Sequence, residues 1–301
     1  MVISMKEVIS VDGVWKVFGR TVALRNVSLK VPSGSVFLIM GPNGSGKSTL
    51  LKLITGLMKP TRGRIKVFGE DPWKSRQEIF ARMGAMFEDH SPPDWATGRA
   101  YLEYKASLKG VKDPEKEALR VAKLFKITEF WDRSISTYSS GMRRKLALAD
   151  AFIGDPELII LDEPTVALDK EARAILRETI MNGTKQGKTF VIASHTIVEF
   201  EGLVTHLAIL SLGQVVVSGK VEDVMKKVGI RQVTIKTNEP ETVASFLIRN
   251  GYSIRVHGNH IAIEGLEDPD EVMAKLKNLG VKVEISETRP SLWEIYAKAL
   301  A

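Results

Sequence analysis

A glycine-rich segment between a predicted strand and a predicted helix constrains the fold more than any other feature of this chain. Residues 35–40 have the apolar run of a buried strand, and residues 47–55 have the pattern of a helix that ends at Gly56. The segment that joins them completes the phosphate-binding pattern G-x-x-x-x-G-K-[ST]. It consists of Gly41, Pro42, Asn43, Gly44, Ser45, Gly46, Lys47, Ser48 and Thr49. The sequence therefore predicts an α/β domain with a phosphate-binding loop, or P-loop.

The residue types in this loop suit a triphosphate bound together with Mg²⁺. Glycines allow backbone N–H groups to turn toward phosphate oxygens. Lys47 is predicted to neutralise the β- and γ-phosphate oxygens, and the Ser48 hydroxyl is predicted to bind Mg²⁺. The structural alternative is a glycine-rich turn that happens to precede Lys-Ser, and the flanking strand and helix argue against it.

The composition excludes several other classes of protein. The chain has 301 residues and no cysteine, which rules out disulfides, thiolate metal sites and cysteine nucleophiles. Its most apolar short runs, 36–40 and 158–161, are far shorter than the roughly 20 residues that span a bilayer. Residues 1–10 lack the pattern of a secretory signal. We therefore expect a cytoplasmic protein whose membrane role, if it has one, requires a separate membrane partner.

The charge balance bears on nucleic acid as a partner. The net charge is +7, and the basic excess belongs to residues 1–230. These bases are spread out, with one short cluster at Arg143-Arg144-Lys145, and no run alternates basic with aromatic residues. The sequence therefore favours a solvated basic face over a nucleic-acid groove.

Strand and helix patterns alternate along the first part of the chain, which predicts crossovers and a mainly parallel sheet. The predicted buried strands cover residues 83–87, 158–161, 189–193 and 207–210. The stretch 97–152 holds three helical patterns and no convincing strand, so we expect a helical subdomain there. One of its helices is predicted to begin at Asp113-Pro114, and Gly110 is predicted to end the helix before it.

The pattern changes after Val228, where we place the boundary between a first domain, 1–228, and a small second domain, 229–301. The second part shows the order β-α-β-β-α-β followed by a last helix from Ser291. Its second helix is predicted to begin at Asp268 and to end at Gly280, before a strand over 281–285. This order predicts a small α+β domain with a ferredoxin-like fold.

Two carboxylates directly follow the buried strand 158–161. They stand at the carboxyl edge of the predicted sheet, where ligands bind in open α/β sheets. Asp162 is predicted to hold Mg²⁺, and Glu163 is predicted to polarise a water molecule. Acidic residues after a strand commonly just cap a helix or face solvent, but the complete P-loop makes the functional interpretation the stronger one.

The segment Tyr138-Ser139-Ser140-Gly141-Met142 resembles the signature motif of ATP-binding-cassette (ABC) ATPases, and the order of motifs over residues 7–225 is similar to that family. The family pattern is usually Leu-Ser-Gly-Gly-Gln, so Ser139 and Gly141 match while Ser140 and Met142 depart. A serine hydroxyl and backbone N–H groups at a helix N-terminus suit a γ-phosphate. The resemblance implies that Ser139, Ser140 and Gly141 bind nucleotide; an ordinary helix N-cap has the same sequence.

The same resemblance implies further site residues. Asp169, in Ala167-Leu168-Asp169, is similar to the D-loop, and His195 resembles the switch histidine after the next strand. Phe18 resembles the aromatic residue that stacks on adenine, although Trp15 is a rival and packing in the core is an alternative. Together with Glu163 as base and Lys47, His195 is assigned to catalysis of ATP hydrolysis.

One position departs clearly from the family. Glu88 stands where the family usually has a glutamine, and we expect it to bind Mg²⁺ with Ser48 and Asp162. The following loop, with Trp95, corresponds to the region that receives a coupling helix from the membrane subunit. Trp95 as a core anchor is the alternative.

The resemblance implies an ATPase that works as a head-to-tail dimer with a second copy of itself or a paralogous ATPase subunit, with ATP and Mg²⁺ as cofactors. It also implies an integral membrane permease as partner and a position on the inner face of the cell membrane. Glu88, the departing signature and residues 288–296 resemble ATPase subunits of ABC-2-type exporters. An importer subunit, or a non-transport ABC protein acting on nucleic acid or ribosomes, is the alternative.

Overall fold

The computed structural model describes residues 6–89, 92–228, 232–264, 272, 274–276, 281, 283–288 and 291–300. The chain divides into two compact units, Met1–Gly219 and Lys220–Ala301. The sequence placed this boundary after Val228, so the helix α7 (Val221–Lys227) belongs to the second unit and not to the first.

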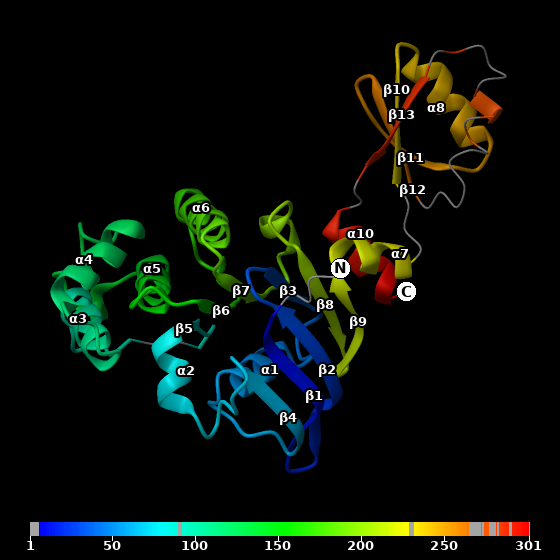
Figure 1. Ribbon diagram of the computed structural model, residues 1–301. Coiled ribbons are helices and arrows are strands. Elements are labelled where there is room, and N and C mark those ends of the chain that lie inside the picture. Colours follow the sequence, from blue (N-terminus) through cyan, green and yellow to red (C-terminus); the bar gives the residue numbers. More distant parts are fainter. Residues whose placement is uncertain are drawn as a thin grey trace. The chain divides into compact units, whose positions relative to one another are not determined.

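A six-stranded sheet forms the centre of the first unit (Figure 1). Its strands lie in the order β5 (Met83–Met86), β6 (Leu158–Asp162), β7 (Thr189–Ala193), β3 (Val36–Met40), β8 (His206–Ser211) and β9 (Gln214–Lys220). The pairs β5–β6, β6–β7, β7–β3 and β3–β8 are parallel. Every residue of β3, β6 and β7 is buried, as continuous apolar runs predict for parallel strands. The prediction of a mainly parallel sheet is confirmed.

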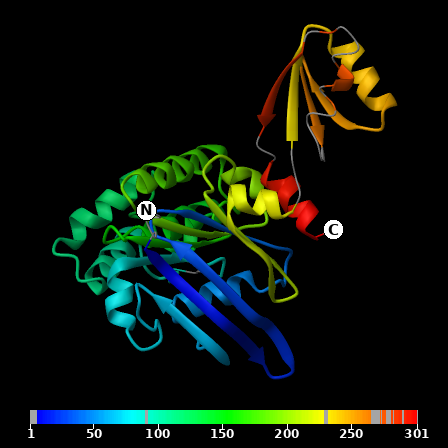
Figure 2. The ribbon, with the colours of Figure 1, turned by 45° about the vertical axis from the view of Figure 1, so that its right-hand side comes forward.

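A second, antiparallel sheet has the order β2 (Thr21–Pro32), β1 (Glu7–Phe18), β4 (Arg62–Val67). In the view of Figure 2 its blue strands lie on a different side of this unit from the green helices. Only the short run 27–31 of this sheet is strand-like in the sequence, because the strands of the sheet alternate apolar with charged residues and break register at bulges. The helix α1 (Lys47–Ile54) contributes Leu50, Leu51 and Ile54 to the core that both sheets share.

The helix α2 (Arg76–Arg82) leads from β4 of the antiparallel sheet to β5 of the parallel sheet, and α6 (Lys170–Lys185) connects β6 with β7. Short 3₁₀ turns cover Ile135–Thr137 and Ile197–Phe200. Within the described part of the chain, no helix is long and apolar enough to cross a membrane.

Three helices make up the helical subdomain, as predicted: α3 (Gly98–Leu108), α4 (Pro114–Leu124) and α5 (Ser140–Ala151). They lie side by side in Figure 1. The Asp113 side chain accepts a hydrogen bond from the backbone N–H of Lys116 at 3.0 Å, so Asp113 caps α4 as predicted. Gly110 adopts a φ of 72°, a left-handed conformation that ends a helix at low cost in glycine.

Charged side chains fix the C-terminal end of α5 within this subdomain. The Lys109 ammonium donates to the Ile153 carbonyl at 2.7 Å, and the Glu117 carboxylate accepts from the backbone N–H of Gly154 at 2.7 Å. Burial lowers the pKa of Lys109 to about 8, although the nearby Asp150 carboxylate opposes this shift. Lys109 therefore titrates close to neutral pH.

We expect the amine of Lys109 to be acylated at a rate that reaches half its maximum near pH 8, because only the neutral amine is a nucleophile. Burial disfavours the charged amine in the folded chain. The free energy of unfolding should therefore increase as pH rises from about 8, the folded pKa, to 10.5, the ordinary value. Pulse acylation and peptide mass spectrometry at several pH values measure the rate. A half-point above pH 10 at Lys109 would contradict the burial argument.

The second unit contains a four-stranded antiparallel sheet in the order β11 (Ser253–His257), β12 (His260–Glu264), β10 (Gln232–Thr237), β13 (Val283–Thr288). The helix α8 (Pro240–Arg249) packs Val243 and Leu247 against this sheet, and α10 (Leu292–Leu300) ends the unit. This strand order is the one expected of a ferredoxin-like fold. The predicted helix over 268–280 lies mostly outside the described residues; the four positions described within it, 272 and 274–276, are helical. The strand predicted over 281–285 corresponds to β13, which begins at Val283.

Candidate functional site

The P-loop follows β3 directly, and its glycines are required for steric reasons. Gly46 has a φ of 103°, and a Cβ atom there would lie 2.6 Å from Leu24 Cδ2. A Cβ atom on Gly41 would lie 2.4 Å from the Leu210 carbonyl oxygen. Gly44 also has a positive φ, 77°, in open space. The loop can therefore approach its neighbours closely and turn its backbone N–H groups into the space in front of α1.

A cavity of about 340 Å³ opens in front of this loop. Residues from four separate parts of the chain meet there, which brings the P-loop together with the residues predicted after β5, β6 and β7. Its lining residues are Asn43, Gly44, Gly46, Lys47, Ser48, Thr49, Glu88, Glu163 and His195.

Lys47 is held by the P-loop itself. Its side chain is nearly buried, and its ammonium donates to the carbonyl oxygens of Gly41 at 2.8 Å and Pro42 at 3.3 Å. The same ammonium lies 4.0 Å from Glu163 Oε1. Ser45 belongs to the same loop, and its buried hydroxyl has no hydrogen-bond partner among the described residues. The ammonium is thus positioned at the cavity before any phosphate binds.

Asp162 provides a buried carboxylate at the end of β6. Its Oδ1 atom has no hydrogen-bond partner in the described part of the chain, whereas the Ser48 hydroxyl donates to the carboxylate. Burial raises the pKa of Asp162, and the negative charges of Glu163 and Glu88 raise it further. A nearby cation would stabilise the charged form of this carboxylate. A carboxylate and a hydroxyl are oxygen ligands of the kind that Mg²⁺ prefers.

Glu163 has a positive φ of 47°, and its backbone N–H donates to the Ala193 carbonyl at 2.8 Å. This conformation places its carboxylate beside the residues that follow β7. Glu163 Oε1 accepts from the backbone N–H of His195 at 3.0 Å, and Oε2 accepts from the Ser194 hydroxyl at 3.2 Å. His195 Nδ1 lies 2.9 Å from Oε2. The predicted base and the predicted switch histidine therefore form one hydrogen-bonded pair.

Glu88 lines the cavity as an exposed side chain, two residues after the end of β5. Among the described residues, no group of three or more histidine, cysteine or acidic side chains is arranged to hold a metal ion. This arrangement differs from an all-protein metal cage. It is compatible with a cation held by one or two carboxylates and a phosphate group, which is the usual mode for Mg²⁺.

The predicted signature and D-loop residues form a second cluster outside this cavity. Ser139 and Ser140 are exposed at the start of α5, and the Ser139 hydroxyl accepts from the backbone N–H of Met142 at 3.2 Å. Asp169 caps α6 and pairs with Lys145 of α5 at 2.8 Å, which lowers the pKa of Asp169. The ion pair ties α5 to Asp169, and none of Ser139, Ser140, Gly141 or Asp169 lines the P-loop cavity.

Two aromatic side chains are exposed. Phe18 is 44% exposed, with the Lys16 ammonium 4.9 Å from its ring, and it lies outside the set of residues that line the P-loop cavity. Trp95 is 86% exposed. Packing in the core is therefore wrong as an explanation of either residue, since a core aromatic would be buried.

Sequence reasoning missed two residues of the site. Ser194 bonds the Glu163 carboxylate, and Arg144 of α5 donates to the carbonyl oxygens of Asp162 and Glu88, each at 3.4 Å. Arg144 was noticed only as part of a basic cluster. The position of Arg144 in the sequence does not predict these contacts, because they form between α5 and the ends of two strands that lie far from it along the chain.

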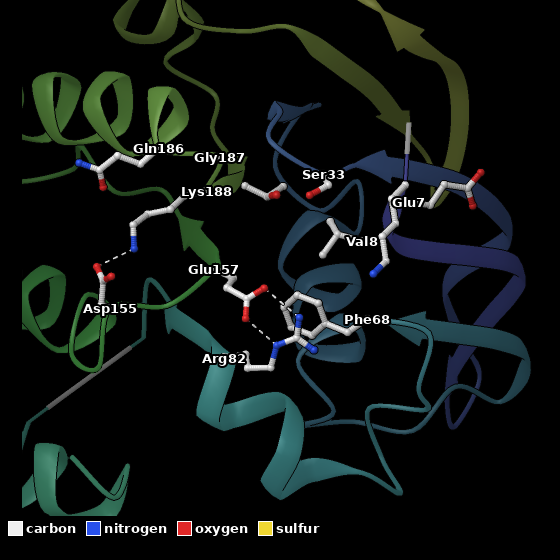
Figure 3. A pocket seen from close by; sticks show the side chains of 12 residues that line it. Glu7, Val8, Ser33, Phe68, Arg82, Asp155, Glu157, Gln186, Gly187 and Lys188 are labelled. Atoms are coloured by element: carbon white, nitrogen blue, oxygen red, sulfur yellow. Dashed lines mark hydrogen bonds and ion pairs between the residues drawn. The ribbon is translucent and has the colours of Figure 1, made fainter. Parts of the chain in front are cut away.

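A second cavity, of about 400 Å³, lies at the amino ends of β5, β6 and β7, at the opposite edge of the sheet (Figure 3). Four of its charged side chains form two ion pairs: Arg82 pairs with Glu157 at 2.7 Å, and Lys188 pairs with Asp155 at 2.6 Å. The Arg82 guanidinium also covers the ring of Phe68. These contacts account for the charges as structural ion pairs.

Comparison with known proteins agrees with the cavity's chemistry. The family described as ABC transporter matches residues 24–166. An ABC transporter ATP-binding protein of Bacillus subtilis, NatA, is 35% identical over 203 residues, which cover 66% of this chain and 82% of that protein. The Nod factor export ATP-binding protein I of Rhizobium leguminosarum is 26% identical over 96% of this chain and 94% of that protein.

A solved structure extends this likeness to an assembly. A dimeric ATP-binding cassette in a post-hydrolysis state, bound to ADP and phosphate, is 27% identical with a TM-score of 0.64. The match covers 70% of this chain and 98% of that one.

Proposed function

The chain belongs to the ABC transporter family as an ATP-binding protein, and on this premise we propose that it powers an exporter through a Mg²⁺-dependent ATPase cycle. The protein binds ATP and hydrolyses it to ADP and phosphate. The observation that carries the proposal is the meeting of Lys47, Glu163 and His195 around one cavity at the P-loop.

Each residue of the cavity has a role that its contacts support. Lys47 exchanges its bonds to the Gly41 and Pro42 carbonyls for phosphate oxygens, which lie in front of the same loop. Glu163 accepts the proton of the attacking water as general base. His195 and Ser194 hold the Glu163 carboxylate at hydrogen-bond distance, so that its direction is set before the substrate arrives.

Ser48, Asp162 and Glu88 are the residues we propose for holding Mg²⁺. Asp162 Oδ1 is buried without a hydrogen-bond partner among the described residues, and the Ser48 hydroxyl already faces that carboxylate. Mg²⁺, when bound, neutralises charge that develops between the β- and γ-phosphates. Glu88 adds a third oxygen donor at the cavity, where the family usually carries an amide.

The exposed signature cluster supports a head-to-tail dimer with a second copy of this chain or a paralogous subunit. Ser139 and Ser140 present a hydroxyl and backbone N–H groups at the N-terminus of a helix, away from the cavity of their own chain. In a head-to-tail pair this end reaches the γ-phosphate held by the other P-loop. Asp169 lies at the same interface, and Phe18 stacks on adenine at the outer end of the site.

An integral membrane permease is the second partner we propose, with the ATPase bound to the inner face of the membrane. Trp95, 86% exposed in the loop that leads into the helical subdomain, is the residue proposed to contact it. Transport outward is supported by the relative that is named for Nod factor export, which matches over nearly the whole chain, including the second unit. An importer remains the rival.

Asp162→Asn tests the metal site. We expect this variant to weaken ATP binding in Mg²⁺ by at least about tenfold, the scale seen when metal-site partners are lost, and to leave binding in EDTA unchanged. The nucleotide-free variant should melt at a higher temperature, because the raised pKa of Asp162 shows that its buried charge opposes folding above that pKa.

Titration calorimetry with ATP, with and without Mg²⁺, measures the effect. Asp155→Asn is the matched control, since Asp155 lies at the other edge of the sheet and pairs with Lys188. Equal Mg²⁺ dependence in the wild type and in Asp162→Asn would refute this assignment.

A further inference from the structure

Arg144 is a buried cation that links α5 to the catalytic edge of the sheet. It is 8% exposed, and its guanidinium donates to three main-chain carbonyls. One terminal nitrogen donates to the Glu163 carbonyl and, at 3.4 Å, to that of Asp162; the other donates to the Glu88 carbonyl at 3.4 Å. One side chain therefore holds the backbone after β6 and the backbone after β5.

The surroundings of Arg144 are acidic. Burial lowers the pKa of Arg144, whereas the carboxylates of Glu88, Asp162 and Glu163 act in the opposite direction. Its Nε is buried and has no hydrogen-bond partner in the described part of the chain. A buried donor without a partner is unfavourable for stability, so a purely structural role does not account for this side chain. The cation offsets part of the negative charge that the three acids place around the cavity.

The contact at Glu163 bears on the direction of its carboxylate. A positive φ is strained in a residue other than glycine, and it persists only where neighbouring contacts hold it. At Glu163 those contacts are the Ala193 carbonyl, which accepts from its N–H, and the Arg144 guanidinium, which donates to its carbonyl. The peptide groups on both sides of Glu163 are thus fixed.

We propose that Arg144 is a positioning residue for ATP hydrolysis: it fixes the backbone that aims the Glu163 and Glu88 carboxylates, and it makes their geometry depend on α5. Arg144 lies on the same helix as Ser139 and Ser140, and the helix is rigid over this distance. A γ-phosphate bound at the start of α5 is therefore mechanically connected to the base. The inference rests on the roles proposed above for Glu163 and the signature residues.

The test compares Arg144→Lys and Arg144→Met with the neighbouring variant Arg143→Met. Arg143 is a matched control because it sits on the same helix but pairs with Asp94 at 2.5 Å, outside the P-loop cavity. We expect kcat to fall about 10–100-fold in Arg144→Met, because small displacements of a catalytic group have effects of this size. Arg144→Lys keeps the charge but lacks the planar fork, so it should fall between Arg144→Met and the wild type.

The readouts separate positioning from simple destabilisation. We expect the ATP KM and the dissociation constant for ATP in EDTA to stay within about threefold of the wild type, so that the loss appears in kcat. In a Glu88→Gln background, Arg144→Met should lower kcat by a smaller factor than in the wild type, because less negative charge then needs to be offset.

Four results would overturn the proposal. They are a loss of ATP binding parallel to the loss of kcat, full activity in Arg144→Met, an equal loss in Arg143→Met, or effects of Glu88→Gln and Arg144→Met that multiply independently. A wild-type chain that fails to bind or hydrolyse ATP would instead refute the proposed function, which the variants are measured against.

Discussion

Glu163→Gln is expected to lower kcat for ATP hydrolysis by about 10²–10⁴-fold, the contribution typical of a positioned general base. Glutamine keeps the shape of the side chain, and its amide oxygen, placed where Oε2 lies, can still accept from the Ser194 hydroxyl and from the backbone N–H of His195. It cannot accept a proton from water. ATP binding should persist, because the Lys47 ammonium and the P-loop backbone are unchanged.

The measurement is steady-state phosphate release together with the dissociation constant for ATP. Glu157→Gln is the control: this glutamate precedes β6, as Glu163 follows it, but it pairs with Arg82 at the opposite edge of the sheet. Hydrolysis at the wild-type rate in Glu163→Gln would mean that another group accepts the proton.

Gly84→Ala is expected to destabilise the first unit by about 3 kcal/mol or more, the upper range for overpacking a buried position. Gly84 lies in β5, and a Cβ atom there would lie 1.7 Å from the carbonyl oxygen of Ala151, the last residue of α5. Both atoms belong to backbone, so no side-chain rotation can relieve the clash. Either β5 or α5 must move, and with α5 the Arg144 contacts move as well.

Chemical denaturation of the two variants Gly84→Ala and Gly19→Ala separates this clash from ordinary glycine strain. Gly19 has a φ of 56°, and a Cβ atom added there would meet nothing within 4 Å. Gly19→Ala should therefore lower the free energy of unfolding by only about 1 kcal/mol. Equal stability of Gly84→Ala and the wild type would show that α5 and β5 do not pack as described.

The parallel sheet could be predicted from the sequence because its strands are short apolar runs bounded by turn residues. β3, β6 and β7 are buried on both faces, and every position in them is apolar except Asp162 at the end of β6 and Thr189 at the start of β7. The antiparallel strand β4, with the sequence Arg-Gly-Arg-Ile-Lys-Val, has charged residues on its exposed face. Its short alternation gave too weak a signal, and β1 was missed in the same way.

The cavity was predictable where the chemistry is local. The P-loop, Asp162 and Glu163 follow directly from residues that are adjacent in sequence to a buried strand. The contacts of Arg144 were not predictable, because they join residues 18 and 56 positions apart. The exposure of Ser139 away from its own P-loop agrees with the head-to-tail dimer that the family resemblance implies, but sequence order alone does not say which end of a helix faces which cavity.

The head-to-tail dimer closed by ATP is the central claim, and the mass of the particle in solution tests it most directly. Light scattering on a sizing column in Mg-ATP, for the wild type and for Glu163→Gln, is the measurement. We expect the wild type to return to monomer as it hydrolyses ATP, and Glu163→Gln to stay dimeric, with Ser139→Arg abolishing the dimer because it blocks the exposed helix end. A Glu163→Gln chain that binds ATP at saturation and still elutes as a monomer would contradict the claim.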